Sequence, residues 1–274
     1  MHRYGGMTTM SHVDLHLHLL PGVDDGPPDE AASLVHAERL AREGVHEATV
    51  TPHIGHPDYP LDVATIAERT RALQAAIAAE GIELLLHPGG EIHPLGATTL
   101  APEELDLIAH GPRDARWVLF EVPFAGIDTE WLAACQHIRD AGFSLLIGHP
   151  ERAEGFLTGG HELLRPELAA GALLQVNVCS LLGRHGPEAY EGAVRLVRDG
   201  DAYVLASDGH GSRHRSHTLA AGTAAALAAG VSPLRAEQLT TANPRFLLRD
   251  GIPREPRPWE SSRRRSATAA LHRR

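Results

Sequence analysis

The chain has 274 residues, of which 43% are hydrophobic and 22% charged, and its formal net charge is −10 at pH 7. These values suit one large α/β domain, and no apolar run approaches the ~18 residues that a membrane span requires. Residues 254–274 hold seven arginines and two glutamates, a charge of +5, so the first 253 residues carry −15 and do not favour nucleic-acid binding.

Short apolar runs alternate with amphipathic segments along the whole chain. The expected strands are residues 12–17, 47–51, 82–87, 117–122, 144–147, 173–177 and 203–206. The expected helices are residues 30–43, 62–80, 129–141, 187–199 and 217–229, with a last helix from 233 to about 248. This alternation predicts a parallel sheet or barrel, and seven strands fit a (β/α)7 barrel better than an open sheet. No G-x-G-x-x-G follows the first strand, which counts against a dinucleotide-binding fold.

Three regions are expected, with one domain between two extensions. Residues 1–10 are expected to form a disordered N-terminal extension without the apolar core of a secretory signal. Residues 11–253 form the domain, and the Arg-rich residues 254–274 form a disordered tail. The two cysteines, Cys135 and Cys179, make no disulfide framework or zinc-thiolate pattern. They are expected to be core residues of a cytoplasmic protein.

Two short motifs, H-x-H at residues 16–18 and D-x-H at residues 208–210, lie at or beyond the ends of the first and last expected strands. Side chains two residues apart on a strand point the same way, so each motif directs two side chains toward one point. Imidazole and carboxylate groups are the ligands that divalent cations of borderline and hard character prefer. The two motifs therefore predict a metal site where the strands converge.

Polar side chains follow the other expected strands as well. They are Asp24, Asp25, His53, Glu91, Glu121, His149, Arg152 and Asn177. Enzymes with a (β/α) barrel assemble their sites at these carboxyl ends of the strands. A single histidine in a chain with nineteen would more often be structural, but seven successive strand ends with polar groups predict one shared site.

In order, the motifs H-x-H, T-P-H (51–53), G-x-E (89–91), G-H-P-E-R (148–152) and S-D-x-H (207–210) resemble those of the PHP (polymerase and histidinol phosphatase) superfamily. Within it, H-L-H-L-L-P-G-V-D-D-G (16–26) and N-P-R (243–245) look like the bacterial tyrosine-protein phosphatases of the CpsB/CapC/YwqE type. The resemblance covers about residues 11–253. It implies a distorted (β/α)7 barrel of the PHP type.

The resemblance also implies three divalent metal ions and two phosphate-binding arginines. The first ion would be held by His16, His18, Glu91 and Asp208, the second by Glu91, Glu121 and His149, and the third by Asp25, His53 and His210. The arginines match Arg152 and, less securely, Arg215, for which Arg213 is the competitor. Asp14 is expected to orient a ligand, and His56 and His93, which lie near the motifs, are expected to be surface residues. Five imidazoles among nine ligands favour Mn²⁺ first, with Fe²⁺, Co²⁺ or Zn²⁺ as alternatives, over Mg²⁺.

The expected activity is metal-dependent hydrolysis of phosphotyrosine in a protein, with a tyrosine autokinase of capsule or exopolysaccharide synthesis as partner. Alternatives are a small-molecule phosphatase of the histidinol-phosphate type, a nuclease of this superfamily, and a non-enzymatic scaffold. The acidic body argues against the nuclease, and the full set of ligand types argues against the scaffold. Neither cysteine lies in a C-x5-R loop, so no phosphocysteine intermediate is expected.

Overall fold

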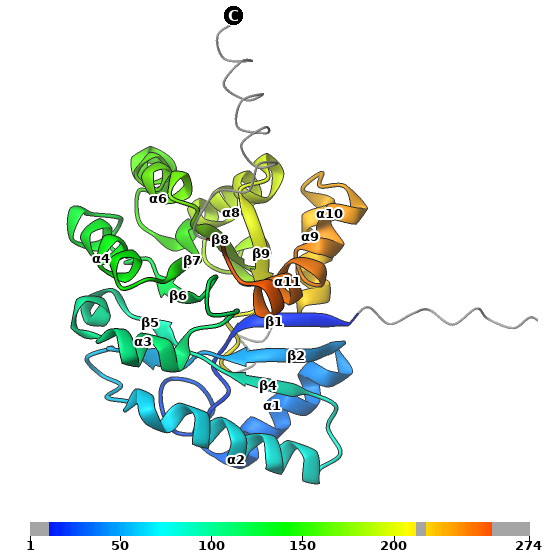
Figure 1. Ribbon diagram of the computed structural model, residues 1–274. Helices are drawn as coiled ribbons and strands as arrows, with labels where there is room; N and C mark the ends of the chain where they lie inside the picture. Colours follow the sequence, from blue (N-terminus) through cyan, green and yellow to red (C-terminus); the bar gives the residue numbers. More distant parts are fainter. Residues whose placement is uncertain (1–10, 212–217, 254–274) are drawn as a thin grey trace, which may run out of the picture.

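The computed structural model describes residues 11–211 and 218–253 of the chain (Figure 1). The expectations for residues 1–10 and 254–274, and those for Arg213 and Arg215, lie outside the described residues. Among the helices that the structure describes, none is both long and apolar enough to cross a membrane.

Parallel strands form two adjoining sheets. One has the order β1-β2-β4 and the other β3-β5-β6-β7-β8-β9, and every strand pair is parallel. The strands are β1 His12–Leu17, β2 Val45–Val50, β3 His53–Ile54, β4 Leu85–Pro88, β5 Glu91–Ile92, β6 Trp117–Glu121, β7 Ser144–Gly148, β8 Leu173–Asn177 and β9 Ala202–Ala206. All seven expected strands are present. Two of them are followed, after a short break, by a second short strand: β3 follows β2, and β5 follows β4.

Local chemistry explains the two breaks. Pro52 separates β2 from β3 and has no N–H to donate to a ladder. Gly89 separates β4 from β5, and a Cβ on Gly89 would lie 2.6 Å from atoms of His110 and Thr49. Beyond the breaks, His53 pairs with Glu91 in register, so both side chains start from the same level of the sheet.

The first and last strands meet at their carboxyl ends. The His18 N–H donates to the carbonyl of Gly209 at 3.0 Å, and the Asp208 N–H donates to the carbonyl of His16 at 2.9 Å. These contacts bring the H-x-H and D-x-H motifs side by side and join the edge of one sheet to the edge of the other, in the arrangement of a distorted (β/α)7 barrel. The buried Asp14 carboxylate supports this junction by accepting from the N–H groups of His16 and Ser207.

Helices surround the strands, as Figure 1 shows. The longer ones are α1 Glu30–Arg42, α2 Ile66–Ala79, α4 Thr129–Asp140, α8 Pro187–Asp199, α9 Leu219–Ala228 and α11 Ala242–Asp250. The shorter ones are α3 Pro102–Ile108, α5 His161–Leu163, α6 Arg165–Ala169, α7 Val178–Leu181 and α10 Pro233–Gln238. Short helical turns of other types cover Val63–Thr65, Pro94–Thr99, Pro150–Arg152 and Phe156–Gly160.

The expected single helix over residues 233–248 is wrong, because the structure has two helices there. Thr241 lies between α10 and α11 with a non-helical φ of −127° and ψ of −78°. Pro244 explains the break, since a proline ring clashes with the carbonyl four residues earlier and cannot donate to it.

Two apolar clusters hold the fold together. The larger lies between the strands and the surrounding helices, and the smaller fills the barrel with strand residues such as Leu15, Trp117 and Val204. Leu247 of α11 joins the smaller cluster, and its carbonyl accepts a 2.9 Å hydrogen bond from the Trp117 indole. Cys135 and Cys179 are free and buried, as expected of core residues.

Candidate metal centre

The nine side chains expected to bind metal converge at the carboxyl ends of the strands. Four overlapping groups of their donor atoms could each hold a cation: His18, Asp25, His53 and His210; His16, His18 and Glu91; His16, His149 and Asp208; and His53, Glu91 and Glu121. Eight of the nine residues are buried, and Asp25 is the exception. The structure thus brings together residues that lie up to about two hundred positions apart.

Two carboxylates lie at the middle of the cluster. Glu91 has oxygens 3.2 Å from His16 Nε2, 3.3 Å from His18 Nε2, 3.1 Å from His53 Nδ1 and 2.9 Å from His149 Nε2. Asp208 Oδ1 lies 3.5 Å from Nε2 of both His16 and His18. One carboxylate among four imidazoles is the arrangement of a bridging ligand shared between neighbouring cations.

A third carboxylate lies at the open side of the cluster. Asp25 Oδ1 lies 3.0 Å from His210 Nε2 and 3.5 Å from His53 Nε2. The side chain of Asp25 is 31% exposed, whereas that of His210 is 1% exposed. Asp25 therefore lies where the cluster is accessible to solvent.

The tautomer of His16 shows that a cation suits this cluster. His16 Nδ1 lies 3.1 Å from Oε1 of Gln175, and the same oxygen accepts from the backbone N–H of His149 at 3.1 Å. Because the backbone N–H can only donate, this atom is the amide oxygen, and Nδ1 of His16 must carry the proton. Nε2 of His16 then faces the oxygens of Glu91 and Asp208. Burial lowers the pKa of His16, but the charges of Glu91 and Asp208 outweigh it and raise that pKa, so without metal a proton on Nε2 lies where a cation could bind.

His18 has the same arrangement with a different partner. Its Nδ1 lies 2.8 Å from Oδ2 of Asp24, so Nδ1 donates and Nε2 faces the cluster. The two Nε2 atoms of His16 and His18 lie 3.3 Å apart. Two lone pairs at this distance repel each other unless a proton or a metal ion lies between them.

The titration of these groups reflects crowded charges. Burial lowers the pKa of His18, but hydrogen bonds with Asp24 and Glu91 outweigh it and raise the pKa to about 9. Burial and the neighbouring Glu91 carboxylate raise the pKa of Glu121 to about 8. Without metal the cluster therefore holds protons where divalent cations would fit, so metal binding is expected to release protons.

Two of the nine side chains depend on unusual backbone. His149 has a φ of 31° and Asp208 a φ of 49°, and no other non-glycine residue among the described ones has a positive φ. This region costs ordinary residues free energy, and such strain gathers at functional sites. His149 follows β7 directly and Asp208 lies two residues after β9, so the turns direct their side chains back over the strand ends.

Arg152 lies at the edge of the cluster. Its Nη1 donates to Oδ2 of Asp208 at 2.9 Å, and the Asn177 amide donates to the same oxygen at 2.8 Å. Its guanidinium lies 4.4 Å from the centre of the Phe124 ring. The side chain is 18% exposed, so it remains accessible to a ligand.

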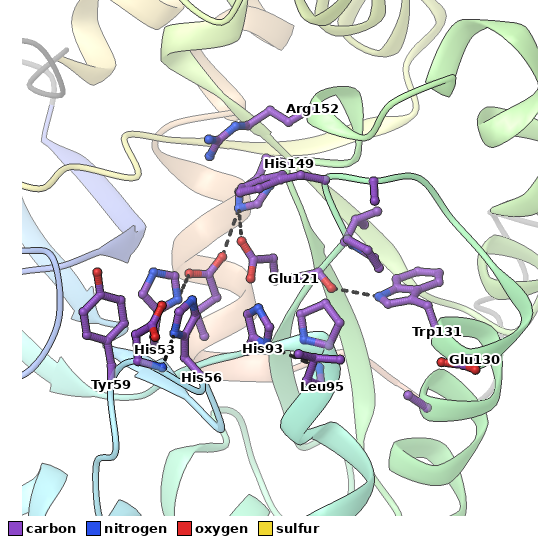
Figure 2. Close-up of a pocket in the computed structure, with 18 of the residues that line it drawn as sticks. His53, His56, Tyr59, His93, Leu95, Glu121, Glu130, Trp131, His149 and Arg152 are labelled. Atoms are coloured by element: carbon purple, nitrogen blue, oxygen red, sulfur yellow. Dashed lines mark hydrogen bonds and ion pairs between the residues drawn. The ribbon is translucent and has the colours of Figure 1, made fainter.

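A pocket of about 570 Å³ opens from the cluster to the surface. Figure 2 shows Arg152 and His149 on one side of this space and His53, His56, Tyr59 and His93 on another. His56 and His93, which were expected to be surface residues, are partly exposed and line this pocket. Their rings lie 4.5 Å apart, and the His56 ring lies 5.2 Å from that of His53.

Sequence reasoning assigned no role to Gln175 or Asp24, which orient the two histidines of the first motif. Asp24 is adjacent in the sequence to the expected ligand Asp25, and this position could have indicated a role in the site. Gln175 lies inside β8, two residues before Asn177, and on a barrel strand this spacing places both side chains on one face.

A parallel (β/α) barrel with a histidine and carboxylate cluster at its strand ends defines a metal-binding barrel of the PHP type. The sequence profile of the family "Capsular polysaccharide synthesis, CpsB/CapC" matches residues 12–249, and the chain belongs to this family.

Named relatives agree with this assignment. The chain is 29% identical over 207 residues to tyrosine-protein phosphatase YwqE of Bacillus subtilis (strain 168), covering 75% of this chain and 80% of the relative. It is 26% identical over 207 residues to the putative tyrosine-protein phosphatase CapC of Staphylococcus aureus, covering 76% and 80%.

Solved structures agree as well. A structure from the work on YwqE from Bacillus subtilis and CpsB from Streptococcus pneumoniae, named unique metal-dependent tyrosine phosphatases, matches with a TM-score of 0.75 at 27% identity. The match covers 88% of this chain and 96% of that one. The phosphotriesterase homology protein from Escherichia coli matches with a TM-score of 0.53 at 14% identity, over 87% and 98%, which shows the fold alone.

Proposed function

We propose that the protein is a metal-dependent phosphomonoesterase that hydrolyses phosphotyrosine in proteins. The observation that carries this proposal is the convergence of nine side chains that could bind metal, six of which line one surface-opening pocket together with Arg152. The relatives named as tyrosine phosphatases support the same activity.

Three divalent ions are proposed, with Mn²⁺ as the first choice. His16, His18, Glu91 and Asp208 would hold one, Glu91, Glu121 and His149 a second, and Asp25, His53 and His210 a third. The short distances from Glu91 to His16, His18 and His149 support its sharing between two ions. The 3.0 and 3.5 Å contacts of Asp25 support the third.

Charge balance supports an anionic substrate. Three divalent ions would bring +6, and the four carboxylates of Asp25, Glu91, Glu121 and Asp208 bring −4. The site would keep +2 before Arg152 is counted, which suits the dianion of a phosphate monoester and a hydroxide. The chemistry that such ions supply when bound is activation of water and neutralisation of the phosphoryl oxygens.

The protein's own groups bind and orient the substrate. Arg152 would hold two phosphoryl oxygens with its planar guanidinium. Asp208 accepts a hydrogen bond from that guanidinium, and the Asn177 amide donates to the same Asp208 oxygen. Either Arg215 or Arg213 is proposed as a second phosphate-binding arginine. Gln175 and Asp24 hold the imidazoles of His16 and His18 in the tautomer that leaves Nε2 free for metal.

The shape of the pocket supports a protein substrate. Its lining runs from buried Glu91 and Asp208 to exposed Leu95, Phe124 and Glu130, so a tyrosine side chain on a polypeptide has access. A bacterial tyrosine autokinase of capsule or exopolysaccharide synthesis is the proposed partner, in agreement with the family's description. A cytoplasmic location is proposed because both cysteines are free.

Turnover with added Mn²⁺ on three substrates tests the proposal. The substrates are a phosphotyrosyl peptide, histidinol phosphate and a phosphodiester. We expect the peptide to be hydrolysed with the highest kcat/KM. Preference for histidinol phosphate would establish the small-molecule alternative, and preference for the diester would establish a nuclease.

A further inference from the structure

An exposed aromatic ring forms part of the wall of the pocket. Phe124 is 50% exposed, although it follows the fully buried strand β6 by only three residues. Other large apolar side chains of the described residues are exposed too, but among them only Leu95 shares this pocket with Phe124. Because burying apolar surface is favourable, the exposed half of this ring can still contribute to the binding of a ligand.

The position of Phe124 ties it to the phosphate-binding end of the pocket. Its ring centre lies 4.4 Å from the Arg152 guanidinium carbon and 5.8 Å from the centre of the His149 ring. In an aryl phosphate, one oxygen atom separates the phosphorus from the ring. A phosphoryl group on Arg152 therefore brings a phenyl ring within contact range of Phe124.

We propose that Phe124 is a specificity-determining residue that selects aryl phosphomonoesters over alkyl phosphomonoesters. The proposal rests on the proposed phosphatase function and names the substrate class of the same site. The ring offers a phenyl group an aromatic surface for edge-to-face or offset-stacked contact. A phosphoserine or another alkyl phosphate has no ring to place there, and it gains only the contacts of Arg152 and the metal-binding cluster.

Phe124 could instead act only by holding Arg152 in place. The two roles predict different effects of a Phe124 substitution on the turnover of aryl and alkyl substrates. Loss of an aryl contact weakens aryl substrates alone. Loss of the cation–π contact with Arg152 weakens every phosphate monoester alike. The ratio of kcat/KM for matched aryl and alkyl substrates therefore separates the roles.

The test compares Phe124→Ala and Phe124→Tyr with the wild type, each loaded with Mn²⁺. The substrates are one peptide carrying phosphotyrosine and the same peptide carrying phosphoserine. With Phe124→Ala we expect kcat/KM for phosphotyrosine to fall about three- to tenfold, mainly through KM, from the worth of one aromatic pair. The phosphoserine value should stay within about twofold, and Phe124→Tyr should restore the aryl preference.

A binding measurement makes the test independent of turnover. Phenylphosphonate and methylphosphonate are compared as inhibitors, and Phe124→Ala should weaken the first and not the second. Leu234→Ala is the matched control, because Leu234 is 68% exposed and does not line the pocket. Equal loss on both substrates, or no loss on either, would overturn the proposal. A wild type that hydrolyses neither peptide would instead refute the phosphatase function itself.

Discussion

Gln175 and His16 lie 159 residues apart in the chain and 3.1 Å apart in the fold, where the Gln175 amide oxygen accepts the Nδ1 proton of His16. This one contact determines which nitrogen of His16 faces the cluster. The same oxygen accepts from the N–H of His149, so Gln175 also fixes the strained turn that presents another expected ligand. Gln175, which is not itself a proposed metal ligand, thus orients two proposed ligands, His16 and His149.

Gln175→Leu should lower the affinity for the metal that involves His16 by about 10- to 100-fold, the usual loss when a group that orients a ligand is removed. Metal titration of the EDTA-stripped protein, followed by calorimetry, measures it. Gln136→Leu is the control, because Gln136 is exposed on α4. If Gln175→Leu bound metal with wild-type affinity, the proposed role of this hydrogen bond would be wrong.

Asp208→Asn and His18→Ala should each abolish phosphatase activity while leaving the fold in place. Burial opposes ionisation of Asp208, but the imidazoles of His16 and His210 hold its pKa well below its usual range. Asp208 is therefore an anion that an amide cannot replace. Activity is measured after reconstitution with Mn²⁺, and circular dichroism checks the fold. Full activity of either reconstituted variant would contradict the assignment.

Much of the fold can be predicted from local sequence patterns, such as the proline and glycine residues that bound a helix. Helix α8 begins at Pro187 and ends before Gly200, whose φ is 87°, and these two residues mark its bounds in the sequence. The break before α11 was missed because Pro244 lies in the first turn of a helix, where proline is tolerated, and apolar periodicity continued across it. Helix α3 was missed because its seven residues are too few for a periodic pattern.

Some residues of the candidate site can likewise be predicted from the sequence, and others cannot. Its nine expected ligands could be found because imidazoles and carboxylates recur at strand ends in motifs of fixed spacing. His56 and His93 belong to no such motif, and only the folded chain shows that their rings meet beside His53. Gln175 carries no charge and binds through its amide, so nothing in its residue type marks it as part of a metal site.

EDTA should eliminate turnover, and Mn²⁺, Fe²⁺, Co²⁺ or Zn²⁺ should restore it better than Mg²⁺. Five of the nine proposed ligands are imidazoles, which suit these transition metals, whereas Mg²⁺ prefers shells made of oxygen. Elemental analysis of the purified protein and reconstitution assays measure both effects. Turnover that resists EDTA in a protein without transition metal would refute the metal dependence.

His36 should make the protein less stable in acid. Burial, with help from Arg39, lowers its pKa to about 3, whereas its pKa in the unfolded chain is 6.5. Below pH 6.5 the unfolded chain takes up a proton that the folded protein refuses, so this stabilising contribution is present above pH 6.5 and is lost as the pH falls toward 3.

His36→Leu removes that contribution, and within residues 11–211 and 218–253 Nδ1 of His36 has no hydrogen-bond partner to lose. Between pH 7 and pH 5.5 the unfolding free energy of the variant should rise relative to wild type by roughly 1.3 kcal/mol. Urea unfolding in EDTA at both pH values measures the difference between the two proteins. Parallel pH profiles would show that His36 titrates normally.

Arg152→Ala should slow phosphomonoester turnover by about two to three decades, the usual loss when a charge-assisted contact to a developing phosphoryl charge is removed. Arg215→Ala should slow it less, and both variants should keep their metal content. The Nη1 of Arg152 donates to Oδ2 of Asp208, so its guanidinium is held in place before substrate arrives.

Arg152→Lys should rescue turnover poorly, because an ammonium group cannot reproduce the two parallel donors of the guanidinium. Steady-state kinetics and elemental analysis of the same preparations separate the outcomes. If Arg152→Ala lost metal, Arg152 would support the Asp208 ligand and would not bind phosphate. If it kept wild-type turnover, the phosphate would bind elsewhere, and Arg213 would be the next residue to substitute.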